Sequence, residues 1–254
     1  MTGAGERRSV TWLGHATVVV DLDGTRLLTD PVLRPRVMHL RRAWSADTRA
    51  LHGVDAVLVS HVHFDHLDLP SLERLGRTVP LVVPTGAGGL LRKHRFERVV
   101  EVGVGEEVRV GAVTVVATEA DHEADRGPFG ATAASLGFLV HGTRTLYFAG
   151  DTDVFPGMAD IAPSLDVALL PVAGWGPKTG PGHLDPERAA QALTLLRPRV
   201  CIPIHWGTYR PFAWSPAQRA AAELSPEELR RLAKAAAPDV RIEVLGRNGT
   251  FALD

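Results

Sequence analysis

The sequence predicts an α/β fold in which two β-sheets pack face to face and helices cover their outer surfaces. About a dozen short apolar segments have the length and composition of strands, and they occur in both halves of the 254-residue chain. Segments with helix-start signals lie between them, as expected for helices outside packed sheets. No stretch resembles a linker or a low-complexity spacer, so we expect a single domain over residues 1–254.

In the first half, the strands begin with a hairpin. The segments VTWLGHATVVVDL and TRLLTD flank Asp23-Gly24, a dipeptide that favours a two-residue hairpin turn. Residues 55–60 (DAVLVS) have the character of a short apolar strand. After it we expect a helix from Pro70 to Leu75, a strand at LVVP and a second helix from Ala87 to His94.

The second half contains most of the remaining strands and two helices with clear start signals. Asp185 can cap a helix that has Pro186 at its first position, and Ser225-Pro226-Glu227-Glu228 has the pattern of a capping box. Apolar strands are expected at 98–102, 107–110, 112–118, 135–140, 144–149, 166–170 and 199–204.

Composition and charge argue against several classes of protein. With 28 basic and 29 acidic residues the formal net charge is −1, which gives no overall attraction to nucleic acid or to a membrane. The single cysteine, Cys201, rules out an internal disulfide, fits a reducing compartment and, within VCIPI, is expected to be buried. The start MTGAGERRSV lacks a signal peptide's apolar run, and no segment approaches the roughly 18 apolar residues of a membrane helix. We therefore expect a soluble cytoplasmic protein without a nucleic-acid or membrane partner.

The segment HVHFDH (61–66) concentrates four metal-ligand side chains directly after the strand DAVLVS. In an extended segment residues two apart point the same way, so His61 and His63 can reach one cation together. The following turn directs Asp65 and His66 toward a neighbouring point, which favours two metals over one. Imidazole and carboxylate suit zinc, manganese or iron, and the absence of thiolates argues against a closed structural zinc site. The alternative is an exposed polar turn without metal, but such a motif arises by chance in on the order of one chain in a thousand.

Further ligands are available where other expected strands end. His122 follows the strand VTVVATEA, Asp151 follows TLYFAG, and His205 follows RVCIPI. Each of these residues lies just beyond the carboxyl end of a strand, as His61 does. Four strand ends that converge on one rim would build a site for two metals.

Together HVHFDH, the turn FAGDT and the late segment PIHWG resemble the metallo-β-lactamase superfamily over nearly the whole chain. The segments TWLGHATVVVDLDGTRLLTDPV, GHLDPERAA and IPIHWGTY are similar to one branch of it. That branch includes N-acylphosphatidylethanolamine-hydrolysing phospholipase D and ascorbate-6-phosphate lactonase-like hydrolases. The resemblance implies a four-layer αββα sandwich with two divalent metal ions, zinc being expected and manganese or iron the alternatives. By the family pattern, Asp151 would bridge a first metal held by His61, His63 and His122 and a second held by Asp65, His66 and His205.

Charge suggests the chemistry of such a site. Two divalent cations carry +4, Asp65 and Asp151 return −2, and a bridging hydroxide leaves about +1, which favours an anionic or strongly polarised substrate. Metal binding lowers the pKa of water from 15.7 toward about 7, so hydroxide becomes available at neutral pH. We therefore expect a metal-dependent hydrolase of a small, anionic ester, either a phosphodiester or a lactone. A nuclease of the same fold, a flavin-linked di-iron reductase and a non-enzymatic metal-binding protein are the alternatives.

Some residues outside the ligand pattern are candidates for acting on substrate. His183 precedes the Asp185-capped helix in the Gly/Pro-rich segment PVAGWGPKTGPGH. It is either a loop or capping residue or, as the resemblance implies, it lies over the metals and protonates a leaving group. With Asp151 it is our predicted catalytic residue. Trp175 and Tyr209 are predicted substrate contacts, although either can simply pack.

The segments GHA and TDP, with the loop after them, contain further candidates. His15 lies in GHA, and Asp30 in TDP either orients a ligand imidazole or has a buried turn or capping role. The segment from Asp30 to Gly53 is long for a surface loop, and a solvated loop is the simplest interpretation. Its length nevertheless favours a function, and arginine suits recognition of phosphate or carboxylate. Its arginines are Arg34, Arg36, Arg41, Arg42 and Arg49.

Overall fold

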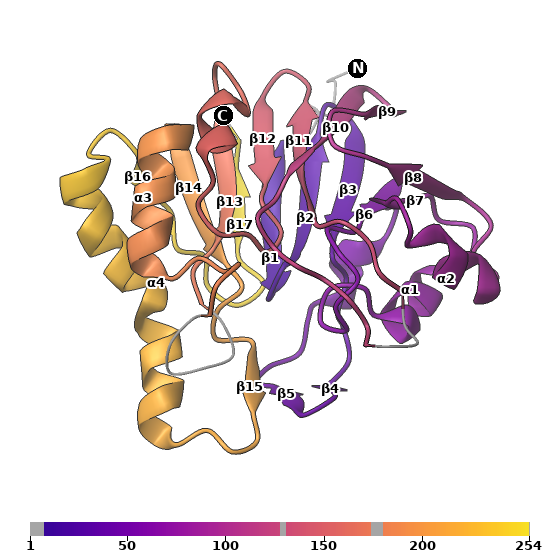
Figure 1. Cartoon of the computed structure of the whole chain (residues 1–254), viewed down its shortest axis with the longest axis horizontal. Helices are drawn as coiled ribbons and strands as arrows, with labels where there is room; N and C mark the ends of the chain where they lie inside the picture. Colours follow the sequence, from indigo (N-terminus) through magenta and orange to yellow (C-terminus); the bar gives the residue numbers. More distant parts are fainter. Residues whose placement is uncertain (1–7, 128–130, 174–179, 254) are drawn as a thin grey trace, which may run out of the picture.

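Two seven-stranded β-sheets pack face to face in the computed structural model, and helices lie on the outer surface of each (Figure 1). The structure describes residues 8–127, 131–173 and 180–253. The first sheet has the strand order β17 (Thr250–Ala252), β1 (Ser9–Gly14), β2 (Thr17–Leu22), β3 (Thr25–Thr29), β6 (Ala56–Leu58), β7 (Leu81–Pro84) and β8 (Val99–Val102). The second has the order β16 (Arg241–Ile242), β14 (Val200–Ile204), β13 (Val167–Pro171), β12 (Thr145–Phe148), β11 (Leu136–His141), β10 (Val113–Glu119) and β9 (Glu107–Val110).

The main hydrophobic core lies between the two sheets. In β2 the side chains of Val18 and Val20 belong to this core, whereas Val19 points to the outer face of the first sheet. In β13 Leu169 faces the same core and Leu170 faces outward in the second sheet. Side chains alternate along a strand, so a strand covered on both faces needs apolar residues at nearly every position. This explains the nearly unbroken apolar runs.

Helices complete the outer layers. On the first sheet, α1 (Leu69–Leu75) and α2 (Gly88–Lys93) contribute Leu72 and Leu91 to the outer cluster. On the second sheet, α3 (Pro186–Leu196) and α4 (Pro216–Ala236) contribute Leu193 and Leu229 to a cluster that also contains the buried Cys201. The four-layer αββα prediction is confirmed. Among the described residues, no helix has the length and apolar character needed to cross a membrane.

Most of the expected strands and helices form near the expected residues, and local sequence explains their ends. Asp23 and Gly24 have φ angles of 51° and 75°, which is the left-handed conformation that a two-residue hairpin between β2 and β3 requires. The side chain of Asp185 accepts a hydrogen bond from the backbone N–H of Arg188, so it caps α3 as predicted.

The predicted capping box at Ser225–Glu228 is wrong. These residues lie inside α4, which begins after Ser215 with a true capping box between Ser215 and Gln218. The two segments share the pattern Ser-Pro-x-Gln/Glu, so local sequence does not distinguish them. Inside the helix Pro226 donates no hydrogen bond to the preceding turn, and the Ser225 hydroxyl instead donates to the carbonyl of Ala221 at 3.3 Å.

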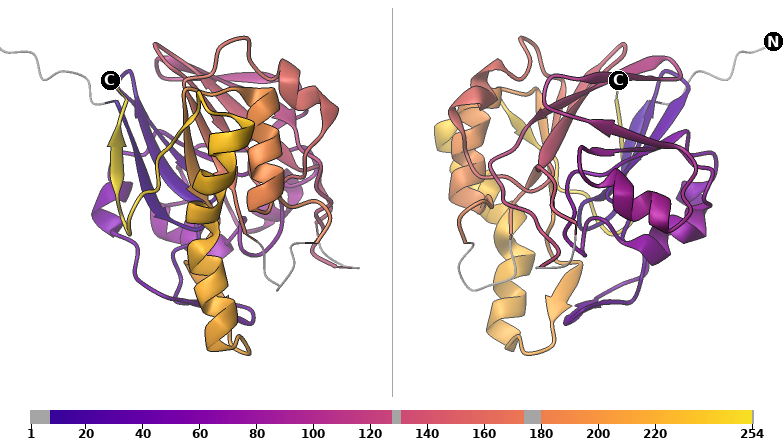
Figure 2. Two further views of the ribbon diagram at one scale, coloured as in Figure 1. Left: turned by 90° about the vertical axis from the view of Figure 1, so that its left-hand side faces the viewer. Right: turned by 45° about the vertical axis from the view of Figure 1, so that its right-hand side comes forward.

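The segment expected to be a long surface loop after Asp30 is partly a small sheet. It forms β4 (Arg36–Val37) and β5 (Leu40–Arg42), followed by the 3₁₀ helix η1 (Thr48–Leu51). A third strand, β15 (Tyr209–Pro211), comes from the distant segment after His205 and pairs with β5. Figures 1 and 2 show this three-stranded sheet beyond the edge of the large sheets, beside the part of α4 that extends past them. The second 3₁₀ helix, η2 (Pro156–Asp160), lies between β12 and β13.

Candidate metal centre

Loops at the carboxyl ends of four strands bring the predicted ligands together. His61 follows β6, His122 follows β10, Asp151 follows β12 and His205 follows β14. The FAGDT turn approaches the HVHFDH loop so closely that a Cβ on Gly150 would lie 2.6 Å from Cβ of Ser60. Gly150 also has a φ of 62°, so only glycine fits this turn without strain.

The first cluster consists of His61, His63 and His122. Nε2 of His61 and Nε2 of His122 lie 3.1 and 3.2 Å from Nδ1 of His63. Ser60 Oγ already donates to a carboxylate, so the Nδ1–H of His61 must donate to Ser60 Oγ at 2.9 Å. The Nδ1–H of His122 donates to the carbonyl of Gly182 at 2.8 Å. These outer bonds fix the tautomer of both rings, so two Nε2 lone pairs point at one spot, as metal-ligating imidazoles do.

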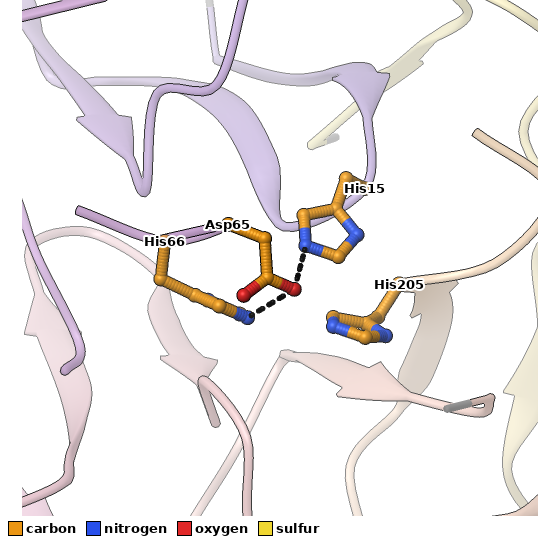
Figure 3. Close-up of side chains that lie close together, drawn as sticks. All are labelled: His15, Asp65, His66 and His205. Carbon is orange, nitrogen blue, oxygen red and sulfur yellow. Dashed lines mark ion pairs between the residues drawn. The ribbon is translucent and has the colours of Figure 1, made fainter. Parts of the chain in front are cut away.

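The second cluster consists of His15, Asp65, His66 and His205 (Figure 3). Asp65 Oδ2 lies 3.3 Å from Nε2 of His15 and 3.8 Å from Nε2 of His66. A hydrogen bond on the far side of the ring orients His205, because its Nδ1–H donates to the carbonyl of Ala173 at 2.8 Å. The turn after His63 thus directs Asp65 and His66 to a different point from His61 and His63, as the sequence predicts.

Asp151 lies between the two clusters. Its Oδ2 is 3.2 Å from Nε2 of His66 and its Oδ1 is 3.4 Å from Nε2 of His205, while it also forms a potential ligand group with His122 and His183. In the neutral tautomers, whose Nδ1–H groups donate to Asp30 and to the carbonyl of Ala173, both Nε2 atoms present lone pairs on the side of this carboxylate, an arrangement that a cation among them would stabilise. The position suits a carboxylate that is shared between two metals.

A buried Asp30 orients the HVHFDH loop. Its Oδ2 accepts hydrogen bonds from Ser60 Oγ at 2.5 Å and from Nδ1–H of His66 at 2.7 Å, and its Oδ1 accepts from the backbone N–H of Ser60 at 2.7 Å. Of the two alternatives left by the sequence, the structure has Asp30 contacting the imidazole of His66, one of the predicted ligands. One carboxylate thereby positions His66 directly and His61 through Ser60.

His15 belongs to the second cluster, although we predicted no ligand role for it from the sequence. Its ring is 1% exposed and its centroid lies 4.0 Å from that of His205. The backbone has a φ of 56°, which is unusual for a residue other than glycine, and three hydrogen bonds hold it there. They come from Trp12 Nε1 and the N–H of His205 to the His15 carbonyl, and from the His15 N–H to Thr208 Oγ1. Only the position of the histidine in the GHA motif could have indicated this role.

Burial and neighbouring charges keep most of these imidazoles neutral, the form that binds metals. Burial lowers the pKa of His122 to about 4 and that of His15 to about 3, and it lowers the pKa of His61 well below its usual value. Burial also opposes the charged form of His66, but the carboxylates of Asp151 and Asp65 outweigh it and raise the pKa of His66. For Asp151, burial is outweighed by the imidazoles of His205 and His66, which lower the pKa of the carboxyl group well below its usual value.

The predicted substrate residues have different positions. His183 lies at the mouth of the centre: its Nε2 is 3.6 Å from Asp151 Oδ2, and 26% of its side chain is exposed. Tyr209 is 2% exposed, and its hydroxyl donates to the carbonyl of Arg34 at 2.6 Å. This geometry agrees with the packing alternative, and substrate contact by Tyr209 stays a prediction. Trp175 lies outside the described residues.

The donor set fits two divalent cations. Two groups of nitrogen and oxygen ligands, with Asp151 between them, lie close enough to share ions, and no thiolate is among them. Imidazoles with the outer nitrogen hydrogen-bonded, together with carboxylates, are typical ligands of zinc, manganese and iron. The sandwich and this centre agree with the expectation of a metallo-β-lactamase-type domain.

Comparison with known proteins gives the family. Residues 25–206 match the model of the β-lactamase superfamily domain, so the chain belongs to that family. It is 33% identical over 226 residues to N-acyl-phosphatidylethanolamine-hydrolyzing phospholipase D 1 of Caenorhabditis elegans. The aligned region covers 78% of this chain and 64% of that protein. It is 30% identical over 244 residues to a metal-dependent hydrolase of Methanopyrus kandleri, covering 93% of this chain and 96% of that one. Among solved structures, the metallo hydrolase Igni18 of Ignicoccus hospitalis matches with a TM-score of 0.74 at 22% identity, over 97% of this chain and 98% of that one.

Proposed function

We propose that this protein is a metal-dependent hydrolase that cleaves a small, anionic ester, a phosphodiester or a lactone, at a site for two metals. The observation that carries the proposal is the pair of facing ligand clusters with Asp151 between them. Family membership and relatives named as hydrolases support it.

In this reaction the metals would activate water, and side chains of the protein would hold the metals. Two divalent cations, with zinc expected, would lower the pKa of water from 15.7 to about 7 and stabilise negative charge on the reacting oxygen. His61, His63 and His122 would hold the first cation, and Asp65, His66 and His205 the second. Asp151 would contact both, and the hydrogen bonds from Asp30 keep the ligands in place.

His183 would act on the substrate. Because Nδ1–H of His183 donates to the carbonyl of Pro181 at 3.2 Å, its Nε2 points toward Asp151 and the centre. The side chain is 26% exposed, whereas those of His66 and His205 are 0% and 1% exposed, so a substrate can reach it. Arg188 holds its segment by donating to Asp153 Oδ2 at 2.8 Å and to the His183 carbonyl at 3.4 Å. A histidine placed in this way can donate a proton to the leaving oxygen.

The test combines metal analysis with a substrate screen. The protein would be stripped of metal, reloaded separately with zinc, manganese and iron, and assayed on a nitrophenyl phosphodiester, a set of lactones and a chromogenic β-lactam. We expect two metals per chain and turnover of the phosphodiester or a lactone. Two bound metals without hydrolysis of any of these would overturn the proposal, and cleavage of oligonucleotides alone would favour the nuclease.

A further inference from the structure

Three arginines form a row across the three-stranded sheet. Arg36 of β4 is paired with Arg41 of β5, and Arg41 is in turn paired with Arg210 of β15. Residues paired directly across strands point to the same face, so the three guanidinium groups extend from one surface. The opposite face carries the buried side chains of Val37 and Leu40.

The row is electrostatically unfavourable as it stands. Like charges directly opposite each other on neighbouring strands destabilise a sheet. Among the described residues, neither Arg41 nor Arg36 forms an ion pair with a carboxylate, and the guanidinium of Arg36 lies over the ring of Phe212, 5.6 Å from its centroid. Arg210 pairs with Glu223 of α4, yet its Nε is buried and finds no acceptor in the described part of the chain.

A pocket lies beside this row of arginines. A pocket of about 320 Å³ is lined by Arg41, Arg210 and, from α4, Arg219, and its lining contains no carboxylate. Arg42 also lines it, but its guanidinium is occupied by the carbonyls of Val32, Trp44 and Leu13. Arg34 and Arg49 of the same loop do not line this pocket, and they pair with Asp68 and Asp47.

We propose that Arg41, Arg210 and Arg219 form a binding site for a phosphate group, which we call the arginine pocket. Guanidinium groups recognise phosphate through charge-assisted hydrogen bonds, and several of them around one concavity fit the charge of a phosphate mono- or diester. The site is separate from the metal centre and does not rest on the proposed hydrolase activity. The chain as a whole has a formal net charge of −1, so this basic concentration is local.

The phosphate belongs either to a small molecule or to a lipid head group, and the surroundings do not separate the two. Phe212 and Met38, which flank the row, are 53% and 67% exposed, so apolar contact beside the phosphate is available to both. The chain segments are joined there by a hydrogen bond of 3.3 Å from the Phe212 N–H to the carbonyl of His39. Free phosphate and lipid vesicles are therefore separate arms of one experiment.

The experiment compares the metal-loaded protein with the double variant Arg41→Gln/Arg219→Gln. Calorimetric titration with inorganic phosphate forms one arm, and cosedimentation with phosphatidylcholine vesicles with and without phosphatidylglycerol forms the other. We expect the double variant to bind one phosphate fewer per chain, or to bind it at least about tenfold more weakly, in keeping with the loss of charge-assisted hydrogen bonds. Phosphate bound by the metals is common to both proteins and cancels in this comparison.

The matched control is Arg49→Gln/Arg231→Gln, which removes the same charge from side chains that are 87% and 67% exposed and do not line the pocket. The site is supported if, in either arm, the pocket variant loses binding that the control variant keeps. The arm in which this happens identifies the source of the phosphate. Equal binding by all three proteins in both arms, or no binding in either arm, would overturn it.

Discussion

The metal centre and the arginine pocket both gather polar side chains that can bind a ligand, but in opposite environments. At the centre the rings of His15, His66 and His205 are almost fully buried, and outer hydrogen bonds orient the ligand imidazoles. In the arginine pocket Arg41 is exposed, and water screens it from its neighbours. Buried polar groups interact strongly and tolerate few alternatives, whereas exposed charges interact weakly. Removing one group should therefore have a large effect at the centre and a small one in the pocket.

The largest effect is expected at Asp151, because this carboxylate faces both clusters. Asp151→Asn keeps the shape but removes the charge, so metal affinity should fall at both clusters by more than about 100-fold, beyond the loss typical of an outer partner. Most of the activity should be lost with it. Metal titration followed by elemental analysis measures the loss. If the variant retains two metals and near-normal turnover, Asp151 does not bridge.

Removing a ligand from one cluster should separate the two sites. His122→Ala should mainly empty the first site and His205→Ala the second, because each ring belongs to only one of the clusters. Each variant should then retain about one metal per chain under replete conditions, as its remaining ligands are intact. Loss of both metals in either variant would show that the clusters form one cooperative unit and not two sites.

His183 should affect turnover without affecting metal content. As a general acid it contributes about 10²–10⁴-fold in rate, so His183→Ala should slow hydrolysis within that range while both metals and the fold remain. The loss should be smaller for esters with good leaving groups, which need no proton. Turnover on paired good and poor leaving groups, with metal analysis, measures this. Loss of a metal would make His183 a ligand, and unchanged turnover on both substrates would make it a loop residue.

Substitution of His15 tests whether metal binding at the second cluster depends on this fourth residue. His15→Gln should weaken metal binding at the second site by about 10–100-fold, as expected for a residue that contacts or positions a ligand, and should leave the first site unchanged. Competition with a chromogenic chelator distinguishes the two affinities. His15→Phe keeps the ring volume and serves as the companion variant. Unchanged second-site affinity in both variants would assign His15 to packing against His205 and Tyr209.

The smallest effect is expected in the arginine pocket. Arg41→Gln removes a like charge from the row, so the free energy of unfolding should stay within about 0.5 kcal/mol of the original or rise slightly. Urea unfolding of the metal-loaded protein measures it. A loss of more than about 2 kcal/mol would mean that Arg41 supports the fold, and the contrast between the two regions would then fail.

Local sequence was sufficient to predict which candidate ligands come together and where most strands form. The predicted ligands in HVHFDH are close in the chain, and His122, Asp151 and His205 each follow an apolar segment with the length and composition of a buried strand. Alternation along strands then gives the two-faced sheets, because a side chain's direction in a strand depends only on its position. The same logic failed at Ser225, where a start signal within an existing helix is indistinguishable from a real one.

Other features depended on the tertiary structure. His15 joins the second cluster only because a left-handed turn, held by Trp12, Thr208 and His205, directs its ring there, and no local rule predicts such a turn for histidine. The arginine pocket requires Arg41 and Arg210, which are distant in the chain, to become neighbours across β5 and β15. Strand pairing between distant segments is set by the packing of the whole molecule, and the sequence of either segment alone does not contain it.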